Sequence, residues 1–136
     1  MQPQSLACRL LDSVMVGAQR ILVVEDDPAA AELVVGMLTG RWDVQVAVNA
    51  AQALERYDEL QPDLLILDLR LPDGTDGVDV YQTIRRRIGH SPRAILVSGA
   101  DEADDAARAI HIPMLRKPLR QRPLIDLVNR VLSTGR

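Results

Sequence analysis

The stretch that most constrains the fold is residues 64–72, which read Leu-Leu-Ile-Leu-Asp-Leu-Arg-Leu-Pro. Four consecutive apolar residues without alternation are typical of a strand that is buried on both faces, as in a parallel sheet. Asp68 would end this strand, at the place where α/β folds bind their ligands. Taken alone, an aspartate after an apolar run is more often a turn residue or a helix cap, so the rest of the chain decides its role.

Strand and helix patterns alternate along the chain. Residues 21–24 and 93–98 are further continuous apolar runs, residues 43–48 alternate as a more exposed strand does, and residues 112–116 form a poorer strand. Pro113 lacks an N–H group, so it belongs at a sheet edge or at the start of its strand. Helical spacing follows each strand, at residues 30–38, 50–57, 80–88, 102–109 and 124–131. Five strands alternating with five helices predict an α/β fold, a doubly wound parallel sheet with helices on both faces.

Composition narrows the possible functions. A chain of 136 residues is the size of one domain, which we place at residues 20–134, after a flexible N-terminal extension at residues 1–19. The net charge of −3, together with one Trp, two Tyr and no Phe, argues against direct nucleic-acid binding. Cys8 is the only cysteine and no apolar run reaches 18 residues, so we expect a cytoplasmic protein without a membrane span.

Polar side chains follow four of the predicted strands. The first strand leads into Glu25 and Asp26, the third into Asp68, the fourth into Ser98 and the fifth into Lys117. Two unit charges about 4 Å apart repel by roughly 4 kcal/mol at an effective dielectric constant near 20, so clustered carboxylates need a cation. Mg²⁺ prefers such hard oxygen ligands and often binds phosphate oxygens as well. A lysine can pair with a carboxylate or a phosphoryl group, and a serine hydroxyl can donate to a phosphoryl oxygen.

These motifs resemble the receiver domain of bacterial two-component response regulators. The similarity lies in the first strand with the Glu25-Asp26-Asp27-Pro28 turn, in Asp68 before Leu71-Pro72, in Ser98-Gly99 and in Lys117-Pro118. It covers about residues 19–133, with the four motifs in order and each at a strand end. The resemblance implies a flavodoxin-like fold with strand order 2-1-3-4-5.

The resemblance also implies a role for each site residue. Asp68 would be the phosphate acceptor. Asp26 would ligate Mg²⁺ directly and Glu25 through water, and the backbone carbonyl of Arg70 would be a further metal ligand beside Asp68. Ser98 would bind the phosphoryl group, and Lys117 would pair with it from a cis bond to Pro118.

The implied function is that of a receiver domain or single-domain response regulator in a two-component phosphorelay. Phosphate would come from a histidine kinase or a histidine phosphotransfer protein, and the signal would pass on through protein contacts. The chain would not be an enzyme, apart from catalysing its own phosphorylation and dephosphorylation. Acids within residues 101–105 and the bases Arg116, Arg120 and Arg122 also suggest a weak homodimer through the fourth helix, fifth strand and last helix.

Three features depart from the usual receiver pattern. Met114 stands where receivers usually carry an aromatic residue, three positions before the lysine. Nineteen positions separate Ser98 from Lys117, a few fewer than usual, and the loop over residues 72–77 is one residue longer. These features are similar to receivers associated with hybrid sensor histidine kinases.

Three other functions remain as alternatives. A phosphatase or phosphotransferase with an aspartate nucleophile commonly has a second aspartate two positions later, where this chain has Arg70. A nucleotide-binding flavodoxin-like protein would need a glycine-rich phosphate loop after the first strand, which the sequence lacks. A pseudo-receiver that serves as an interaction module without phosphorylation is the third, and Met114 leaves that question open.

Overall fold

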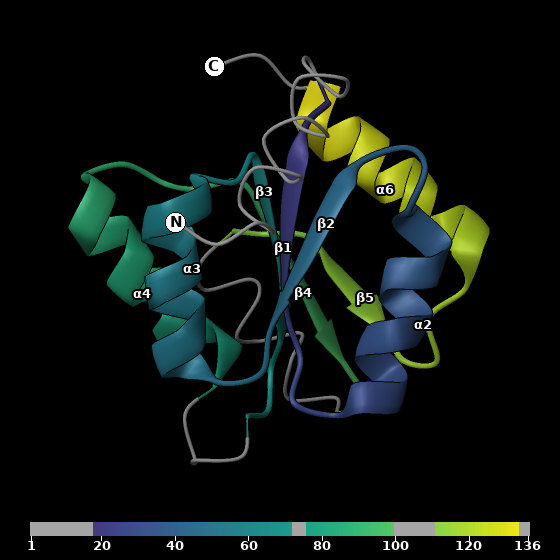
Figure 1. The fold of residues 1–136 in the computed structure, drawn as a ribbon, viewed down its shortest axis with the longest axis horizontal. Coiled ribbons are helices and arrows are strands. Elements are labelled where there is room, and N and C mark those ends of the chain that lie inside the picture. The colour runs from purple at the N-terminus through teal and green to yellow at the C-terminus, as the bar shows by residue number, and fades with distance from the viewer. Residues whose placement is uncertain (1–17, 72–75, 100–110, 134–136) are drawn as a thin grey trace, which may run out of the picture.

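The computed structural model describes residues 18–71, 76–99 and 111–133. One five-stranded parallel sheet runs through the molecule in the order β2-β1-β3-β4-β5, as predicted (Figure 1). Its strands are β1 (Arg20–Val24), β2 (Asp43–Ala47), β3 (Leu64–Asp68), β4 (Ala94–Ser98) and β5 (Met114–Arg116). The carboxyl ends of all five strands therefore lie at one edge of the sheet, which faces down in Figure 1.

Helices cover both faces of the sheet. In Figure 1, α3 (Ala50–Leu60) and α4 (Gly77–Ile88) lie on one side, and α2 (Pro28–Leu38) and α6 (Gln121–Ser133) lie on the other. The fourth predicted helix, at residues 102–109, lies outside the described residues, as do the acids of residues 101–105. None of the described helices is long and apolar enough to cross a membrane.

The three central strands are buried on both faces. Alternate residues of β1, β3 and β4 contribute to two separate apolar clusters, one under α3 and α4 and the other under α2 and α6. The first cluster includes Leu22, Leu65 and Leu96. The second cluster includes Ile21 and Ile95, and Trp42 is also buried there. Burial from both sides explains why the apolar runs of these strands do not alternate with polar residues.

The starts of α2, α3 and α4 are each fixed by a side chain that accepts a backbone hydrogen bond. Asp27 accepts from the N–H of Ala29 ahead of α2, and Asn49 accepts from the N–H of Gln52 ahead of α3. Asp76 forms a capping box with Asp79 at the start of α4. These caps satisfy amide groups that have no partner inside the helix and so define where the three helices begin.

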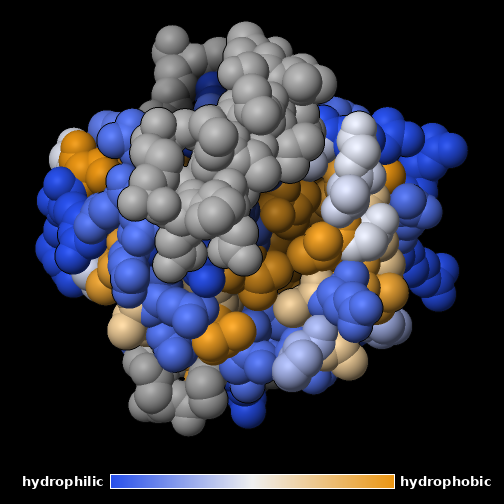
Figure 2. All heavy atoms as spheres, viewed as in Figure 1, coloured by the Kyte–Doolittle hydropathy of each residue, from blue (hydrophilic) through white to orange (hydrophobic). Residues whose placement is uncertain are grey.

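The edge strands differ from the central ones. The predicted strand at residues 112–116 is two residues too long, because the observed strand begins at Met114. Pro113 cannot donate a hydrogen bond and contributes only its carbonyl oxygen, which accepts from the N–H of Leu96. At the opposite edge, most side chains of β2 are half-exposed, including Val44 and Val46. Figure 2 shows an apolar area, in orange, in the middle of the face on which β2 lies.

Candidate functional site

Two neighbouring central strands bring three carboxylates together. Glu25 and Asp26 follow β1, and Asp68 is the last residue of β3, which pairs with β1 up to Val24 and Leu67. Carboxylate oxygens of the three residues lie within 4.8 Å of one another. Glu25 and Asp68 are buried, while Asp26 is more exposed. The structure thus confirms that the predicted acidic residues converge at the carboxyl edge of the sheet.

Lys117 bridges the two buried carboxylates. Its Nζ atom lies 3.1 Å from Glu25 Oε1 and 3.3 Å from Asp68 Oδ2. Its backbone N–H donates to the carbonyl oxygen of Ser98 at 3.0 Å, and its bond to Pro118 is cis, as predicted. Because Lys117 directly follows β5, the strand order places its ammonium group across β4 from Asp68.

The second oxygen of each buried carboxylate accepts a backbone N–H. Glu25 Oε2 accepts from Asp27 at 3.2 Å, and Asp68 Oδ1 accepts from Arg70 at 3.3 Å. Both donors lie two residues after the carboxylate that they contact. Each carboxylate is therefore oriented from one side by its own chain segment and from the other side by Lys117.

The pKa values of the site reflect its crowded negative charge. Burial raises the pKa of Glu25, and its contact with Asp68 raises it further, whereas the Asp27 N–H and Lys117 act in the opposite direction. Burial acts to lower the pKa of Lys117, but the hydrogen bond to Glu25 and the charges of Asp68 and Glu25 outweigh it and raise the value. The site therefore keeps its lysine charged and favours binding of a further cation or proton.

The other predicted residues lie around this centre. Asp68 pairs with Val97 in the sheet, so Ser98 extends one residue beyond it at the end of β4, and its side chain is buried. The predicted role of the Arg70 carbonyl oxygen as a metal ligand stays a prediction. Met114 is half-buried and packs against the apolar cluster under α3 and α4.

Gly77 is a site residue that the motifs do not reveal. It is the first residue of α4, and its N–H donates to the carbonyl oxygen of Leu69 at 2.8 Å. A Cβ atom at this position would lie 2.6 Å from the carbonyl oxygen of Asp68. Only glycine lets α4 begin this close to the strand end that carries Asp68. The two glycines of the turn-rich loop were the only sequence signal, and they do not show which one is needed.

The donor set fits a magnesium ion. Three carboxylate groups within reach of one centre offer hard oxygen ligands, and Asp26 is open to solvent, which suits an ion that keeps part of its water shell. The pKa of Glu25 is raised mainly by burial and further by its contact with Asp68, and a bound cation would oppose both effects by stabilising the charged carboxylate. Glu25, Asp26 and Asp68 are the residues that would hold the ion.

Comparison with known proteins identifies the family. The sequence profile described as the response regulator receiver domain matches residues 21–129. The chain belongs to this family. A putative response regulator from Chloroflexus aurantiacus has a similar structure, with a TM-score of 0.79 and 26% identity over 86% of this chain and 99% of that one. The Vibrio cholerae chemotaxis protein CheY4 has the same fold, with a TM-score of 0.75 and 20% identity over 84% of this chain and 98% of that one.

Curated relatives are longer regulators. The DNA-binding response regulator MtrA of Mycolicibacterium smegmatis is 44% identical over 87 residues, which are 63% of this receiver chain and 37% of MtrA. The transcriptional regulatory protein TrcR of Mycobacterium tuberculosis is 35% identical over 80 residues, which are 58% of this chain and 31% of TrcR. The receiver chain therefore spans little more than a third of these relatives, and only their receiver part aligns.

Proposed function

We propose that this receiver domain accepts a phosphoryl group on Asp68 from a phosphorylated histidine of a partner protein. The observation that carries the proposal is the position of Asp68, which is buried at the end of a central strand and shares Lys117 with Glu25. Its carboxylate accepts hydrogen bonds from the Arg70 N–H and from Lys117. The neighbouring residues Asp26 and Lys117 are exposed, so the site is open to solvent. Such a carboxylate can serve as a nucleophile.

The transfer is a displacement at phosphorus. An oxygen of Asp68 attacks the phosphorus atom, the P–N bond to the imidazole breaks with its electron pair staying on nitrogen, and an acyl phosphate forms. Mg²⁺, when bound, would neutralise charge on the phosphoryl oxygens. The residues of the chain position the groups: the Arg70 N–H orients the nucleophile, Lys117 moves from the carboxylate pair to the phosphoryl group, and Ser98 donates its hydroxyl.

Acetyl phosphate tests the chemistry without a partner protein. With Mg²⁺ present, intact mass should rise by one phosphoryl group in the parent chain, and chelation of Mg²⁺ should abolish the gain. Asp68→Asn should show no gain. Asp27→Asn is the matched control, because this substitution removes the same charge from a nearby position. Asp27 caps α2, and an asparagine caps a helix equally well, so the fold should be unaffected. A gain that persists in Asp68→Asn, or a loss in Asp27→Asn, would contradict the assignment.

The partner surface that fits best is the exposed face of α2. This helix begins three residues after Glu25, and Leu33 on its outer face is 54% exposed, which is unusual for a large apolar side chain in this molecule. A shallow hollow lined by Leu33, Gly36 and Met37 continues this face. A helical histidine-containing protein that packs here would bring its phosphohistidine to the carboxyl edge of the sheet.

The rate of transfer from a protein donor tests this surface. Leu33→Ser should slow phosphorylation by a phosphorylated histidine protein, while the rate from acetyl phosphate stays unchanged. Equal slowing with both donors would show that the substitution damages the site rather than the contact. An unchanged rate with both would place the partner elsewhere.

The remaining parts of the proposal concern the role of the whole protein. We propose that the chain signals through protein contacts, works in the cytoplasm and catalyses only its own phosphorylation and dephosphorylation. The basic half of the weak dimer would be supplied by Arg116, Arg120 and Arg122.

A pseudo-receiver is disfavoured because Lys117 contacts both Glu25 and Asp68. Sedimentation with and without beryllofluoride, at low and high salt, tests the dimer; a monomer under all four conditions would exclude it.

A further inference from the structure

A second hollow lies at the opposite edge of the sheet from Asp68. It has a volume of about 480 Å³ and opens between α4 and α6, beside the segments that lead into β4 and β5. Its apolar lining includes the buried residues Tyr81, Ala94 and Leu127. A cleft of this size with an apolar floor is in the range that holds small organic ligands.

The same hollow is strongly basic. Arg85 from α4, Arg93 from the segment before β4 and Arg130 from α6 line it, and no carboxylate is among its described lining residues. Arg85 and Arg130 lie in the last turns of their helices, whose ends each carry about −0.5 charge. The two helix ends offset about one unit of arginine charge, so Arg85 and Arg130 alone leave about one positive charge in the hollow.

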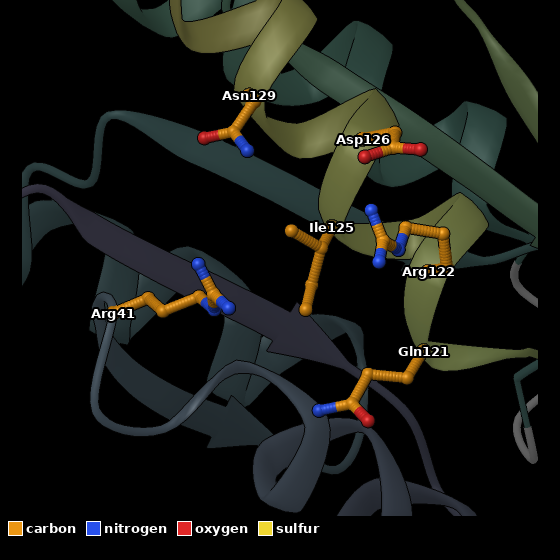
Figure 3. Close-up of a pocket in the computed structure, with 6 residues that line it drawn as sticks. All are labelled: Arg41, Gln121, Arg122, Ile125, Asp126 and Asn129. Carbon is orange, nitrogen blue, oxygen red and sulfur yellow. The ribbon is translucent and has the colours of Figure 1, made fainter.

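The charges of Arg85 and Arg130 are not used within the described part of the fold. Neither side chain forms a salt bridge there, whereas Arg87, two residues after Arg85, pairs with Asp58 at 2.7 Å. The hollow between α6 and the turn before β2 makes a second contrast. There Arg41 and Arg122 are accompanied by the carboxylate of Asp126, which lies next to Arg122 on α6 (Figure 3). Of these two hollows, the one between α4 and α6 combines several arginines with an apolar floor and has no acid among its described lining residues.

We propose that this hollow binds a small phosphorylated compound. The phosphate would lie between the guanidinium groups of Arg85 and Arg130, which present planar pairs of N–H donors that match phosphate oxygens. A phosphate monoester carries a charge of about −1.5 to −2 at pH 7, opposite in sign to the charge that these two arginines leave in the hollow. The organic part would lie against the apolar floor. The site is separate from Asp68 and does not depend on the proposed phosphorylation.

Binding of AMP to the full chain tests the proposal, with inorganic phosphate and adenosine as partial probes. Amide shifts in a two-dimensional NMR titration should map to the residues that line the hollow. AMP should bind more tightly than inorganic phosphate, because only AMP also contacts the floor, and adenosine should not bind. Arg85→Gln and Arg130→Gln should each weaken AMP binding by about tenfold, since each removes a charge-assisted contact.

Matched variants separate a built site from general charge attraction. Arg86→Gln removes the same charge from the same helix turn, but Arg86 does not line the hollow, so AMP affinity should stay within about twofold. Asp68→Asn should leave AMP binding unchanged, which keeps this test independent of the phosphorylation test. The proposal is overturned if AMP and inorganic phosphate at about 10 mM leave these amides unshifted, or if Arg86→Gln weakens binding as much as Arg85→Gln does.

Discussion

The acidic site at the carboxyl edge of the sheet and the basic hollow at its amino edge carry opposite charge. At the carboxyl edge, Glu25, Asp26 and Asp68 gather around one lysine. At the amino edge, three arginines line a hollow without a carboxylate among its described lining residues. The same five strands connect both edges, so the contrast comes from the residues placed where each strand starts and ends.

The two edges are also built in different ways. The polar residues of the carboxyl edge are the last residue of a strand or lie within two residues after it, so their places are fixed by the hydrogen-bonded register of the sheet. The basic residues at the amino edge come from two helix ends and from the segment that leads into β4. The carboxyl edge is therefore specified by local sequence, while the amino edge depends on how the helices pack.

The largest effect should follow from loss of the most exposed acid at the carboxyl edge. Asp26→Asn should weaken Mg²⁺ binding by about 100-fold or more, because it removes the proposed direct ligand of the ion, and loss of a residue that only supports a metal ligand already costs about 10–100-fold. Stability should hardly change, since Asp26 is exposed. Calorimetric Mg²⁺ titration checks the affinity, with Asp27→Asn as the charge-matched control. Equal losses in both variants would mean that general charge, not ligation, holds the ion.

The next effect tests how tightly α4 is fitted to the same edge. Gly77→Ala should destabilise the fold by about 1–3 kcal/mol, because the new methyl group meets the backbone of Asp68, which cannot rotate away. Gly36→Ala is the control: Gly36 lies within α2, two residues before its end, and has open space around it, so the substitution should stabilise the fold by about 0.5–1 kcal/mol. Urea denaturation measures both. If Gly77→Ala is as stable as the parent, the helix start is more adaptable than the structure indicates.

Local signals explain how much of the molecule the sequence predicts. Unalternated runs such as residues 64–67 reveal the buried strands, and a polar residue at the end of each run reveals the site, because parallel strands bring those ends together. The predicted start of β5 was two residues too early, because the apolar sequence pattern continues through Pro113 whereas the paired strand begins only at Met114. Gly77 and the basic hollow were missed, since each depends on a distance between elements that are far apart in sequence or on helix packing.

A smaller effect concerns pH at the carboxyl edge. The raised pKa of Glu25 means that the folded chain binds this proton more tightly than the unfolded chain does. Without metal, Glu25 therefore adds stability as pH falls through its folded pKa, above the ordinary value of 4.5, and loses it as pH rises. The proton and Mg²⁺ compete for this carboxylate. As pH falls through the same window, Mg²⁺ affinity should therefore fall by up to about tenfold per pH unit.

Glu25→Gln isolates this titration. The variant should bind Mg²⁺ more weakly than the parent at all pH values. It should also lack the change in Mg²⁺ affinity that the titration of Glu25 causes above pH 4.5 in the parent. Mg²⁺ titrations at a series of pH values provide the comparison. A step of the same size in parent and variant would assign the proton to another group.

The smallest effect tests the amino edge within a single helix turn. Arg85 and Arg87 both lie in the last turn of α4, so replacing either with Gln loses a similar interaction with the helix end. Their surroundings differ: Arg87 pairs with Asp58 at 2.7 Å, with side-chain exposures of 43% and 57%, while Arg85 lines the basic hollow together with Arg93 and Arg130. An exposed ion pair contributes about 0.2–1 kcal/mol to stability, whereas removing one of several like charges relieves repulsion and so adds stability.

Arg87→Gln should therefore cost about 0.5 kcal/mol more stability than Arg85→Gln in low salt. The difference should shrink in high salt, where screening weakens both the pair and the repulsion. Denaturation curves at two salt concentrations measure it, and equal stabilities in low salt would show that the arginines of the hollow do not repel one another enough to favour an anion.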